Sequence, residues 1–319
     1  MKGHIMKRWL VSLSTLSLLL SASTSALAQS KITFTSNQAG ADDIWVMDAD
    51  GANPVNLTNR AAEDFWSRWS PDGSQIAFDS NFGGEDYDIW VMDADGTNPL
   101  NLTDSEATDF EPAWSPDGSK IAFWSDRDEG NHNIWLMDAD GSNQTRLTEM
   151  PGAEENPTWS PDGSKILFNS DNQLHTMDPD GANIQPLLEG VVCCSAWSPD
   201  GTKIAYMSTT GSGEDIALWE LSVMDADGAN PVRLTDNQFF EGVPKWSSDG
   251  AMIVFFSDRE GAPDIYAMNA DGTNTVRLTA NPVVVDQLPD WYGPATVAAT
   301  AVASSSWGFV KQLAIPPSK

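Results

Sequence analysis

A ten-residue phrase recurs along this chain at nearly regular intervals, and it constrains the fold more than any other feature. The fullest copy, Trp-Ser-Pro-Asp-Gly-Ser-Lys-Ile-Ala-Phe, covers residues 114–123. Its tryptophan occurs six times, 45, 45, 38, 49 and 45 residues apart, at Trp69, Trp114, Trp159, Trp197, Trp246 and Trp291. A second phrase, Met-Asp-Ala-Asp-Gly, keeps the same period, with copies or variants at Met47, Met92, Met137, Met177, Met224 and Met268. Six copies of two phrases in step indicate six repeats of one structural unit.

Each repeat contains the parts of a four-stranded sheet. In the repeat at 111–148, four short β-prone runs cover residues 113–114, 120–125, 133–137 and 145–148. Ser-Pro-Asp-Gly separates the first two runs and suits a tight turn, because proline presets one φ angle and glycine accepts a positive one. Asp-Ala-Asp-Gly fits a hairpin turn after the third run. Four antiparallel strands in about 40–45 residues is the size of a β-propeller blade.

The two ends of the repeat array predict the number of blades. Residues 31–34, 43–47 and 55–58 match the second, third and fourth strands of a unit, while residues 288–291 match a first strand. Joined together they complete one blade. The sequence therefore predicts an all-β, six-bladed propeller of four-stranded antiparallel blades, closed by three N-terminal strands and one C-terminal strand.

The remaining segments predict export. Residues 1–28 combine a basic start, a short apolar run and a small-residue cleavage site, which is typical of a signal peptide cut after Ala28. The apolar run is too short for a transmembrane helix. We expect the propeller to occupy residues 29–293, a flexible tail to occupy 294–319, and the mature protein to be a periplasmic or secreted bacterial monomer.

The charge of the chain excludes some partners. Its formal net charge is −29, with 46 acidic against 17 basic residues. Such a charge argues against binding to nucleic acid or anionic lipid. A hydrated surface and attraction of a basic protein are both compatible with it.

Acidic residues recur five positions before the repeated tryptophans. Because the loops after the second strands and the links between blades share one end of a propeller, these residues should surround the channel there. They are Asp64, Asp109, Glu154, Glu241 and Asp286, with Val192 at the sixth position. A second polar ring should follow twelve residues after the tryptophans, at Asn81, Asp126, Asp171 and Asp258, with His132 nearby.

Two interpretations of these acids remain open. They form either a negatively charged channel mouth that binds a protein or peptide, or structural pairs with loop amides and with Arg127 and Arg259. An alternative function is a structural module stabilised by a cation such as Ca²⁺. The Asp-Ala-Asp-Gly phrases do not support a calcium loop, because glycine comes fourth rather than sixth and the final glutamate is missing. We therefore predict no cofactor and no metal ligands.

Catalytic patterns are missing from the chain. Beyond the signal segment, the histidines are His132, which stands in a loop, and His175, which replaces a tryptophan found at the same place in other repeats. No nucleophile elbow, zinc motif or phosphate-binding loop is present. The adjacent Cys193 and Cys194 are compatible with a vicinal disulfide, an intermolecular bond or free thiols. A non-enzymatic function is the prediction, with a cryptic hydrolase or lyase as the third alternative.

The phrases together resemble a known repeat. Trp-Ser-Pro-Asp-Gly, Ser-Asp-Arg, Ile-Trp-x-Met-Asp-Ala-Asp-Gly and Arg-Leu-Thr, spread over about 260 residues, are similar to the TolB-type, WD-like propeller repeat. The resemblance implies an exported six-bladed ring that acts mainly by binding other proteins. TolB itself carries an α/β domain ahead of its propeller, which this sequence does not show. The same repeat also occurs in propellers of peptidases and sugar lyases.

Overall fold

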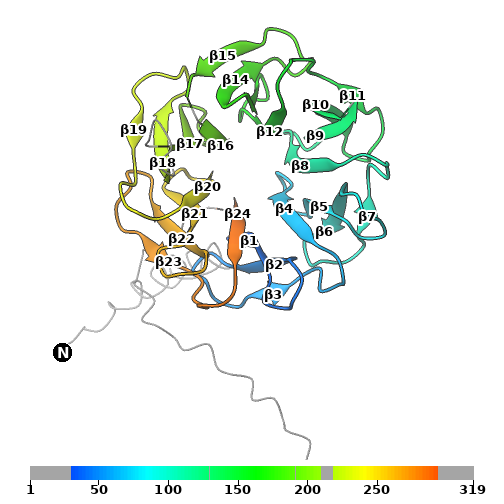
Figure 1. Ribbon diagram of the computed structural model, residues 1–319. Coiled ribbons are helices and arrows are strands. Elements are labelled where there is room, and N and C mark those ends of the chain that lie inside the picture. The colour runs from blue at the N-terminus through cyan, green and yellow to red at the C-terminus, as the bar shows by residue number, and fades with distance from the viewer. Residues whose placement is uncertain (1–29, 129, 191, 210–217, 294–319) are drawn as a thin grey trace, which may run out of the picture.

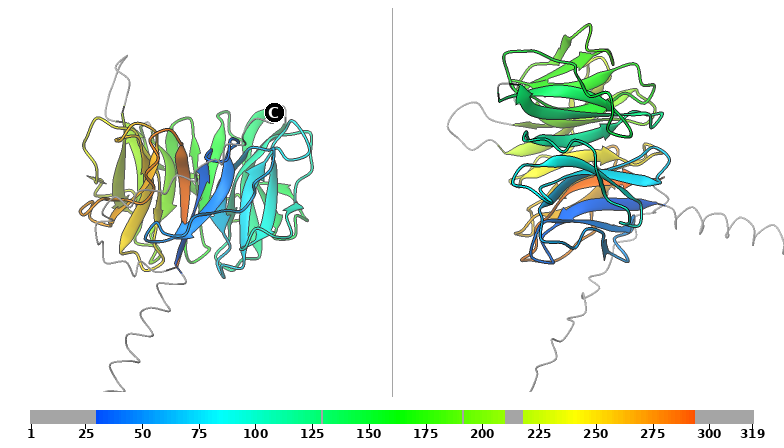
Figure 2. Two further views of the ribbon diagram at one scale, coloured as in Figure 1. Left: turned by 90° about the horizontal axis from the view of Figure 1, so that it is seen from below. Right: turned by 90° about the vertical axis from the view of Figure 1, so that its right-hand side faces the viewer.

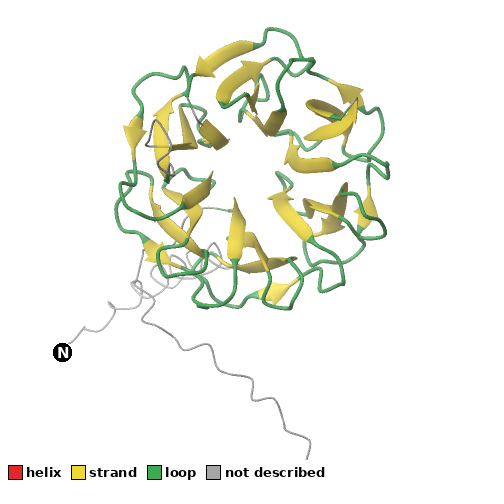
Figure 3. Ribbon diagram, viewed as in Figure 1, coloured by secondary structure: helices red, strands yellow, loops and turns green. Residues whose placement is uncertain are grey.

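The repeats fold into six blades around a central axis. The computed structural model describes residues 30–128, 130–190, 192–209 and 218–293. Within these residues, every blade is a four-stranded antiparallel sheet, and the regular structure consists of strands joined by turns (Figures 1 and 3). The predicted fold class is confirmed. The predicted signal peptide and tail lie outside the described residues.

Blade 1 joins the two ends of the described chain. Its sheet has the order β24 (Asp286–Tyr292), β1 (Lys31–Ser36), β2 (Asp43–Asp48) and β3 (Val55–Asn56). β1 pairs with β24 in a register that places Ile32 opposite Trp291. The indole nitrogen of Trp291 donates a hydrogen bond to the hydroxyl of Ser30 at 2.9 Å. The predicted closure by three strands plus one is therefore confirmed.

The other five blades follow in chain order, each starting with its innermost strand. Blade 2 consists of β4 (Asp64–Trp69), β5 (Gln75–Ser80), β6 (Asp88–Asp93) and β7 (Leu100–Asn101). Blade 3 consists of β8 (Asp109–Trp114), β9 (Lys120–Asp128), β10 (Asn131–Asp138) and β11 (Thr145–Arg146). Blade 4 consists of β12 (Glu154–Trp159), β13 (Ile166–Ser170), β14 (Gln173–Met177) and β15 (Gln185–Leu188). Blade 5 consists of β16 (Val192–Trp197), β17 (Lys203–Thr209), β18 (Trp219–Asp225) and β19 (Val232–Arg233). Blade 6 consists of β20 (Glu241–Trp246), β21 (Met252–Ser257), β22 (Asp264–Asn269) and β23 (Val276–Arg277).

The core lies between the blades. Each second strand buries an apolar residue and an aromatic one, such as Ile121 and Phe123 in β9, both fully buried. Phe123 lies opposite Trp135 of the third strand. In blade 4 the corresponding pair is Phe168 and His175, whose rings stack with centroids 5.5 Å apart. His175 therefore packs in place of tryptophan, as the sequence predicted.

The turns after the first and third strands of each blade share one end of the ring, which we call the turn face, because the strands are antiparallel. The opposite end is the loop face; Figure 2 shows the ring from two further sides. In blade 3 the two turns are linked by a hydrogen bond from Ala139 N to Ser119 O at 2.9 Å. Gly141, with φ of 84°, lies so close to blade 2 that a Cβ atom would meet Leu102 O at 2.7 Å. The Asp-Ala-Asp-Gly phrase is thus a turn that docks on the neighbouring blade.

Candidate functional site

The five carboxylates predicted at the channel mouth open the innermost strands of five blades. Their places at the loop-face end of β4, β8, β12, β20 and β24 agree with the sequence. The side chains themselves are buried, with 0–4 % of each residue exposed: Asp64, Asp109, Glu154, Glu241 and Asp286. These groups are not presented to solvent.

Arginines neutralise three members of this ring. Arg60 donates to Asp64 from Nη2 at 2.9 Å, and Arg127 donates to Asp109 from Nη2 at 2.8 Å. Arg259 pairs with Glu241 in the same way. Each guanidinium also lies against an aromatic ring; that of Arg127 is 4.5 Å from the ring centroid of Trp135. The pairings of Arg127 and Arg259 were predicted, whereas that of Arg60 was not, because it precedes its acid instead of following it.

The remaining two carboxylates, Glu154 and Asp286, form no salt bridge with an arginine among the described residues, and both have raised pKa values. Thr148 donates from its hydroxyl to Glu154 at 3.0 Å, and burial raises the pKa of Glu154 to about 7. Burial likewise raises the pKa of Asp286 to about 6. The geometry of the whole ring therefore matches the structural interpretation that the sequence left open. Binding of a partner at the loop face stays a prediction.

Two residues of the second predicted ring accept hydrogen bonds from the backbone. Asp126 accepts a hydrogen bond from Thr108 N, and Asp258 accepts one from Phe240 N, both at 2.8 Å. Asp171 is exposed. His132 bonds to Glu155 through Nδ1 at 2.6 Å and stacks on Trp124 with ring centroids 4.2 Å apart. These residues do not converge on a common point with the buried carboxylates.

A β-bulge interrupts every innermost strand and turns side chains toward the axis. The register shifts near the third position of each of these strands, and the residue there has φ between 48° and 59°. Side chains other than glycine adopt such angles rarely, and bulges often re-aim residues at functional sites. The six bulge residues are Trp66, Glu111, Asn156, Cys194, Val243 and Leu288.

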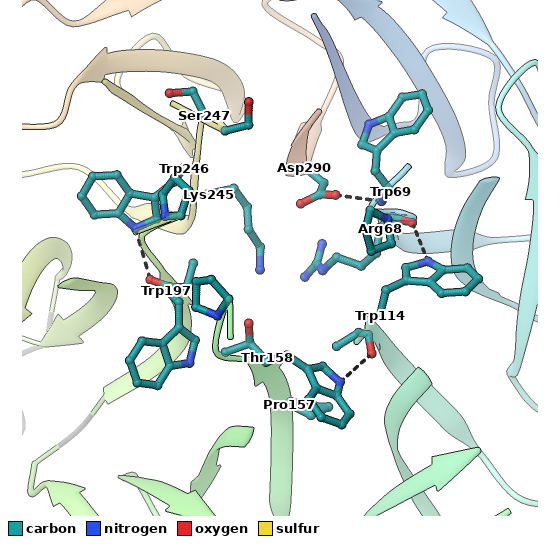
Figure 4. Close-up of a pocket in the computed structure, with 17 residues that line it drawn as sticks. Arg68, Trp69, Trp114, Pro157, Thr158, Trp197, Lys245, Trp246, Ser247 and Asp290 are labelled. Carbon is teal, nitrogen blue, oxygen red and sulfur yellow. Dashed lines mark hydrogen bonds between the residues drawn. The ribbon is translucent and has the colours of Figure 1, made fainter. Parts of the chain in front are cut away.

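Beyond the bulges, the turn-face end of the channel widens into a pocket of about 240 Å³ (Figure 4). All six blades contribute to its wall, which is mainly tryptophan, proline and alanine. Arg68, Lys245 and Asp290 bring charge into it. Each of these three residues directly precedes a repeated tryptophan, so all three occupy one register position of the blade.

Three of the six repeated tryptophans donate a hydrogen bond to a neighbouring blade. The indole nitrogen of Trp114 donates to Arg68 O at 3.3 Å, and that of Trp159 donates to Ala113 O at 3.1 Å. Trp246 donates to Ala196 O at 3.2 Å. These three hydrogen bonds fix part of the pocket wall, whereas the indole nitrogens of Trp69 and Trp197 have no hydrogen-bond partner in the described structure.

The two acidic residues in the channel each have a backbone hydrogen-bond partner. Asp290 accepts a hydrogen bond from Trp69 N at 2.9 Å, and Glu111 accepts one from Asn156 N at 2.7 Å. Burial, and secondarily the charge of Glu155, raise the pKa of Glu111 to about 7. Burial, and secondarily the Arg68 cation, lower the pKa of Lys245 to about 7. A smaller space beneath the pocket is lined by both cations together with Cys194 and Ser195.

Cys193 and Cys194 are free thiols, and Cys194 lines this space. Their sulfur atoms are hydrogen-bonded to each other. This bond, together with burial, raises the pKa of Cys194 well above the usual thiol value. Since the thiolate is the reactive form, Cys194 is not an activated nucleophile.

The sequence prediction did not single out the open pocket at the turn-face end of the channel, and its loop-face site stays a prediction. Aligning the repeats on tryptophan places Arg68, Lys245 and Asp290 in one column, and the other members of that column are Ala113, Thr158 and Ala196. Charge at three of six positions was a visible signal. The bulge that turns neighbouring residues into the channel was not visible in the sequence.

Among the described residues, no group of three or more His, Cys, Asp or Glu side chains is arranged to hold a metal ion. No helix in the described part of the chain has the length and apolarity to cross a membrane.

Comparison with known families supports the fold along most of the ring. Residues 85–206 match the tricorn protease N-terminal beta propeller domain, and residues 190–292 match the TolB beta propeller domain. A segment of 58 residues is 40% identical to the Tol-Pal system protein TolB of Desulfosudis oleivorans. That segment covers 18% of this chain and 12% of the relative, so the chain matches only a small part of the relative's length.

Solved structures extend the likeness to the whole ring. TolB from Acinetobacter baumannii is 21% identical with a TM-score of 0.70, over 84% of this chain and 67% of that one. An oligogalacturonate lyase solved in complex with manganese is 16% identical with a TM-score of 0.54, over 77% of this chain and 72% of that one. At these identities the likeness shows the fold alone. Taken together with the repeated phrases and the closed ring, these matches show a six-bladed β-propeller that is similar to the TolB beta propeller domain over residues 190–292.

Proposed function

We propose that this chain is an exported, non-catalytic scaffold that binds a protein or peptide partner at the turn-face end of its channel. The observation that carries the proposal is the pocket itself. It is concave, formed by all six blades, and walled by tryptophan and proline around a few charged groups. Apolar pockets with a few well-placed polar groups are the usual form of a binding site.

The engagement of the histidines supports a non-catalytic function. His132 is held by Glu155 and Trp124, and His175 is buried against Phe168. Neither lines the channel pocket. A general base must reach the group it deprotonates, and these two side chains are directed elsewhere.

The likeness to TolB supports both a protein partner and export. The curated relatives are named Tol-Pal system protein TolB, a name that places them in a system with other components. The pattern of residues 1–28 agrees with secretion. Amino-terminal sequencing of protein purified from the bacterial envelope tests export directly, and a mature chain starting at Gln29 is the expected result.

Photo-crosslinking in the source bacterium tests the binding face. A photoreactive phenylalanine derivative replaces Ser248 at the pocket rim, Asn98 at the outer edge of the turn face, or Glu106 on the loop face. All three residues are exposed, and Ser248 also lines the pocket. We expect one protein adduct, formed at position 248 and weakly or not at all at positions 98 and 106.

Binding of the purified partner must then be saturable. Adducts that form only at position 106 would overturn the turn-face assignment in favour of the loop face. Equal adducts at all three positions would show unspecific contact and would contradict a defined binding site.

A further inference from the structure

Arg68 and Lys245 are exceptional among the cations of this protein. Ten of the twelve lysines and arginines in the described residues form a salt bridge. Arg68 and Lys245 are the two that do not. With 46 acidic residues in the chain, a shortage of carboxylates does not explain this.

Both unpaired cations point into the channel. Arg68 comes from β4 and Lys245 from β20, and their side chains extend toward each other across the pocket floor (Figure 4). They line the turn-face pocket and also the smaller space beneath it. They therefore separate the two spaces and face any group that enters from the turn face.

The nearby acids, Asp290 and Glu111, act on Lys245 through longer-range electrostatics, but among the described residues neither forms a salt bridge with Lys245 or Arg68. Asp290 and Glu111 each accept a backbone hydrogen bond instead, from Trp69 and Asn156. Arg68 donates to its neighbour's carbonyl, Ser67 O, at 2.9 Å, and its guanidinium lies 5.3 Å from the ring centroid of Trp66. Two like charges facing each other in a partly dehydrated site repel, and a bound anion would offset that repulsion.

A third group favours an anionic ligand. Ser195 lines the lower space, is 3 % exposed, and has a hydroxyl oxygen with no hydrogen-bond partner in the described structure. Buried polar groups are normally hydrogen-bonded. An anion held between the cations would bring an acceptor toward this hydroxyl.

The balance of charge indicates which anion fits. The site holds one full cation, Arg68, and a lysine whose pKa is about 7, and the nearby Asp290 and Glu111 offset part of that positive charge. A ligand with a single negative charge is therefore favoured over a doubly charged phosphate. Arginine binds carboxylates through two parallel hydrogen bonds. A pocket of about 240 Å³ admits a side chain or a chain end rather than a folded domain.

We propose that Arg68 and Lys245 form a carboxylate-binding site, which receives an acidic side chain or the C-terminal carboxylate of a peptide inserted from the turn face. The site rests on the proposed function and adds the chemistry of the group that the partner contributes. The tryptophan and proline wall then contacts the apolar part of the same peptide segment.

Titration of the whole mature protein with small probes tests the site. Backbone amide NMR signals of residues 68, 195 and 245 are followed with N-acetylglycine, N-acetylglutamate α-amide, N-acetylglutamine amide and inorganic phosphate. We expect saturable shifts with the carboxylates and none with the neutral amide, at dissociation constants on the order of millimolar. The first two probes distinguish a chain end from an acidic side chain.

Variants separate charge from structure. Arg68→Gln is expected to weaken carboxylate binding at least about tenfold, since charge-assisted hydrogen bonds are lost. Lys245→Met removes the second cation but keeps most of the apolar stem, and Lys245→Arg should retain binding. Lys203→Met, which removes a cation paired with Asp225 outside the channel, is the matched control and should bind as the parent does.

Two results would overturn the carboxylate site: unchanged binding in Arg68→Gln and Lys245→Met, or tighter binding of phosphate than of either carboxylate. Crosslinking at position 248 then separates the proposals. If the partner adduct persists unchanged in both variants, the scaffold function stands and the carboxylate site does not.

Discussion

Charged residues meet the axis of this propeller in two places, and they are treated differently. At the loop face, buried carboxylates are paired with arginines or hydroxyls. At the channel floor, a few residues along the same strands, Arg68 and Lys245 have no salt bridge among the described residues. In the loop-face ring, Asp109 and Arg127 lie 18 residues apart, as do Glu241 and Arg259. The repeat therefore supplies both the acid and its partner, whereas the channel cations occur in single blades without a repeated partner.

This difference distinguishes the charged residues that hold the fold together from those that are available to bind a partner. A charge encoded together with its partner in one repeat, as in blades 3 and 6, is paired once that blade has folded. A cation introduced into one blade, at a position where other blades carry alanine, threonine or aspartate, has no such partner. We infer that deviations from the repeat, rather than the repeat itself, mark the binding groups of this ring.

The largest expected effect comes from breaking a paired charge at the loop face. Arg127→Met should lower the free energy of unfolding by about 3–5 kcal/mol, because Asp109 is left buried without its cation. Chemical denaturation measures the change. Arg233→Met, which breaks the exposed pair with Asp236, is the control and should cost about 0–1 kcal/mol. Similar losses in both variants would contradict the structural assignment of the ring.

Removal of a channel cation should raise the free energy of unfolding instead of lowering it. Lys245→Met is expected to stabilise the fold by about 1–3 kcal/mol at pH 6, because an unpaired and partly dehydrated charge disappears. The lysine has a lowered pKa in the folded state, so its penalty is full below about pH 7 and fades as the pH approaches the ordinary value of 10.5. The gain should therefore shrink by pH 9. Destabilisation at pH 6 would mean that Lys245 has a structural partner.

A smaller effect should appear in the pH dependence of stability. The pKa of Glu111 is raised from 4.5 to about 7, so the stability it contributes is complete below pH 4.5 and is lost as the pH rises through 7. Glu154, with a pKa of about 7, acts in the same direction. The melting temperature should fall between pH 5 and pH 8, and Glu111→Gln should reduce that fall. A parallel curve for the variant would exclude Glu111 as a contributor.

The smallest expected effect is that of metal removal. Arginines already pair with three of the five buried carboxylates, so a chelator such as EDTA should change the melting temperature by no more than about 1 °C. A ligand that binds only the folded state must raise that temperature. A fall of several degrees on chelation, restored by Ca²⁺, would support the cation-stabilised alternative and would weaken the contrast between the two regions.

Much of the architecture was predictable because it is local and repeated. The turn phrases, the period and the incomplete units at 31–58 and 288–291 were sufficient for the ring and its closure, and the substitution of His175 for tryptophan was readable from alignment of the repeats. The candidate site was less predictable. Antiparallel order placed Asp109 correctly at the loop face, but order alone does not say whether a carboxylate faces solvent or the interior of a blade.

What the sequence determined by itself is the blade, the number of blades and the end of the ring on which each turn lies, because these depend on turn chemistry and strand alternation within about 45 residues. Only the tertiary structure decided which charges are paired and which face the channel. The reason is geometric: bulges at residues such as Glu111 and Cys194 rotate side chains out of the regular alternation. The surroundings of Arg68 and Lys245 are then set by blades far apart in the chain, which meet only when the ring closes.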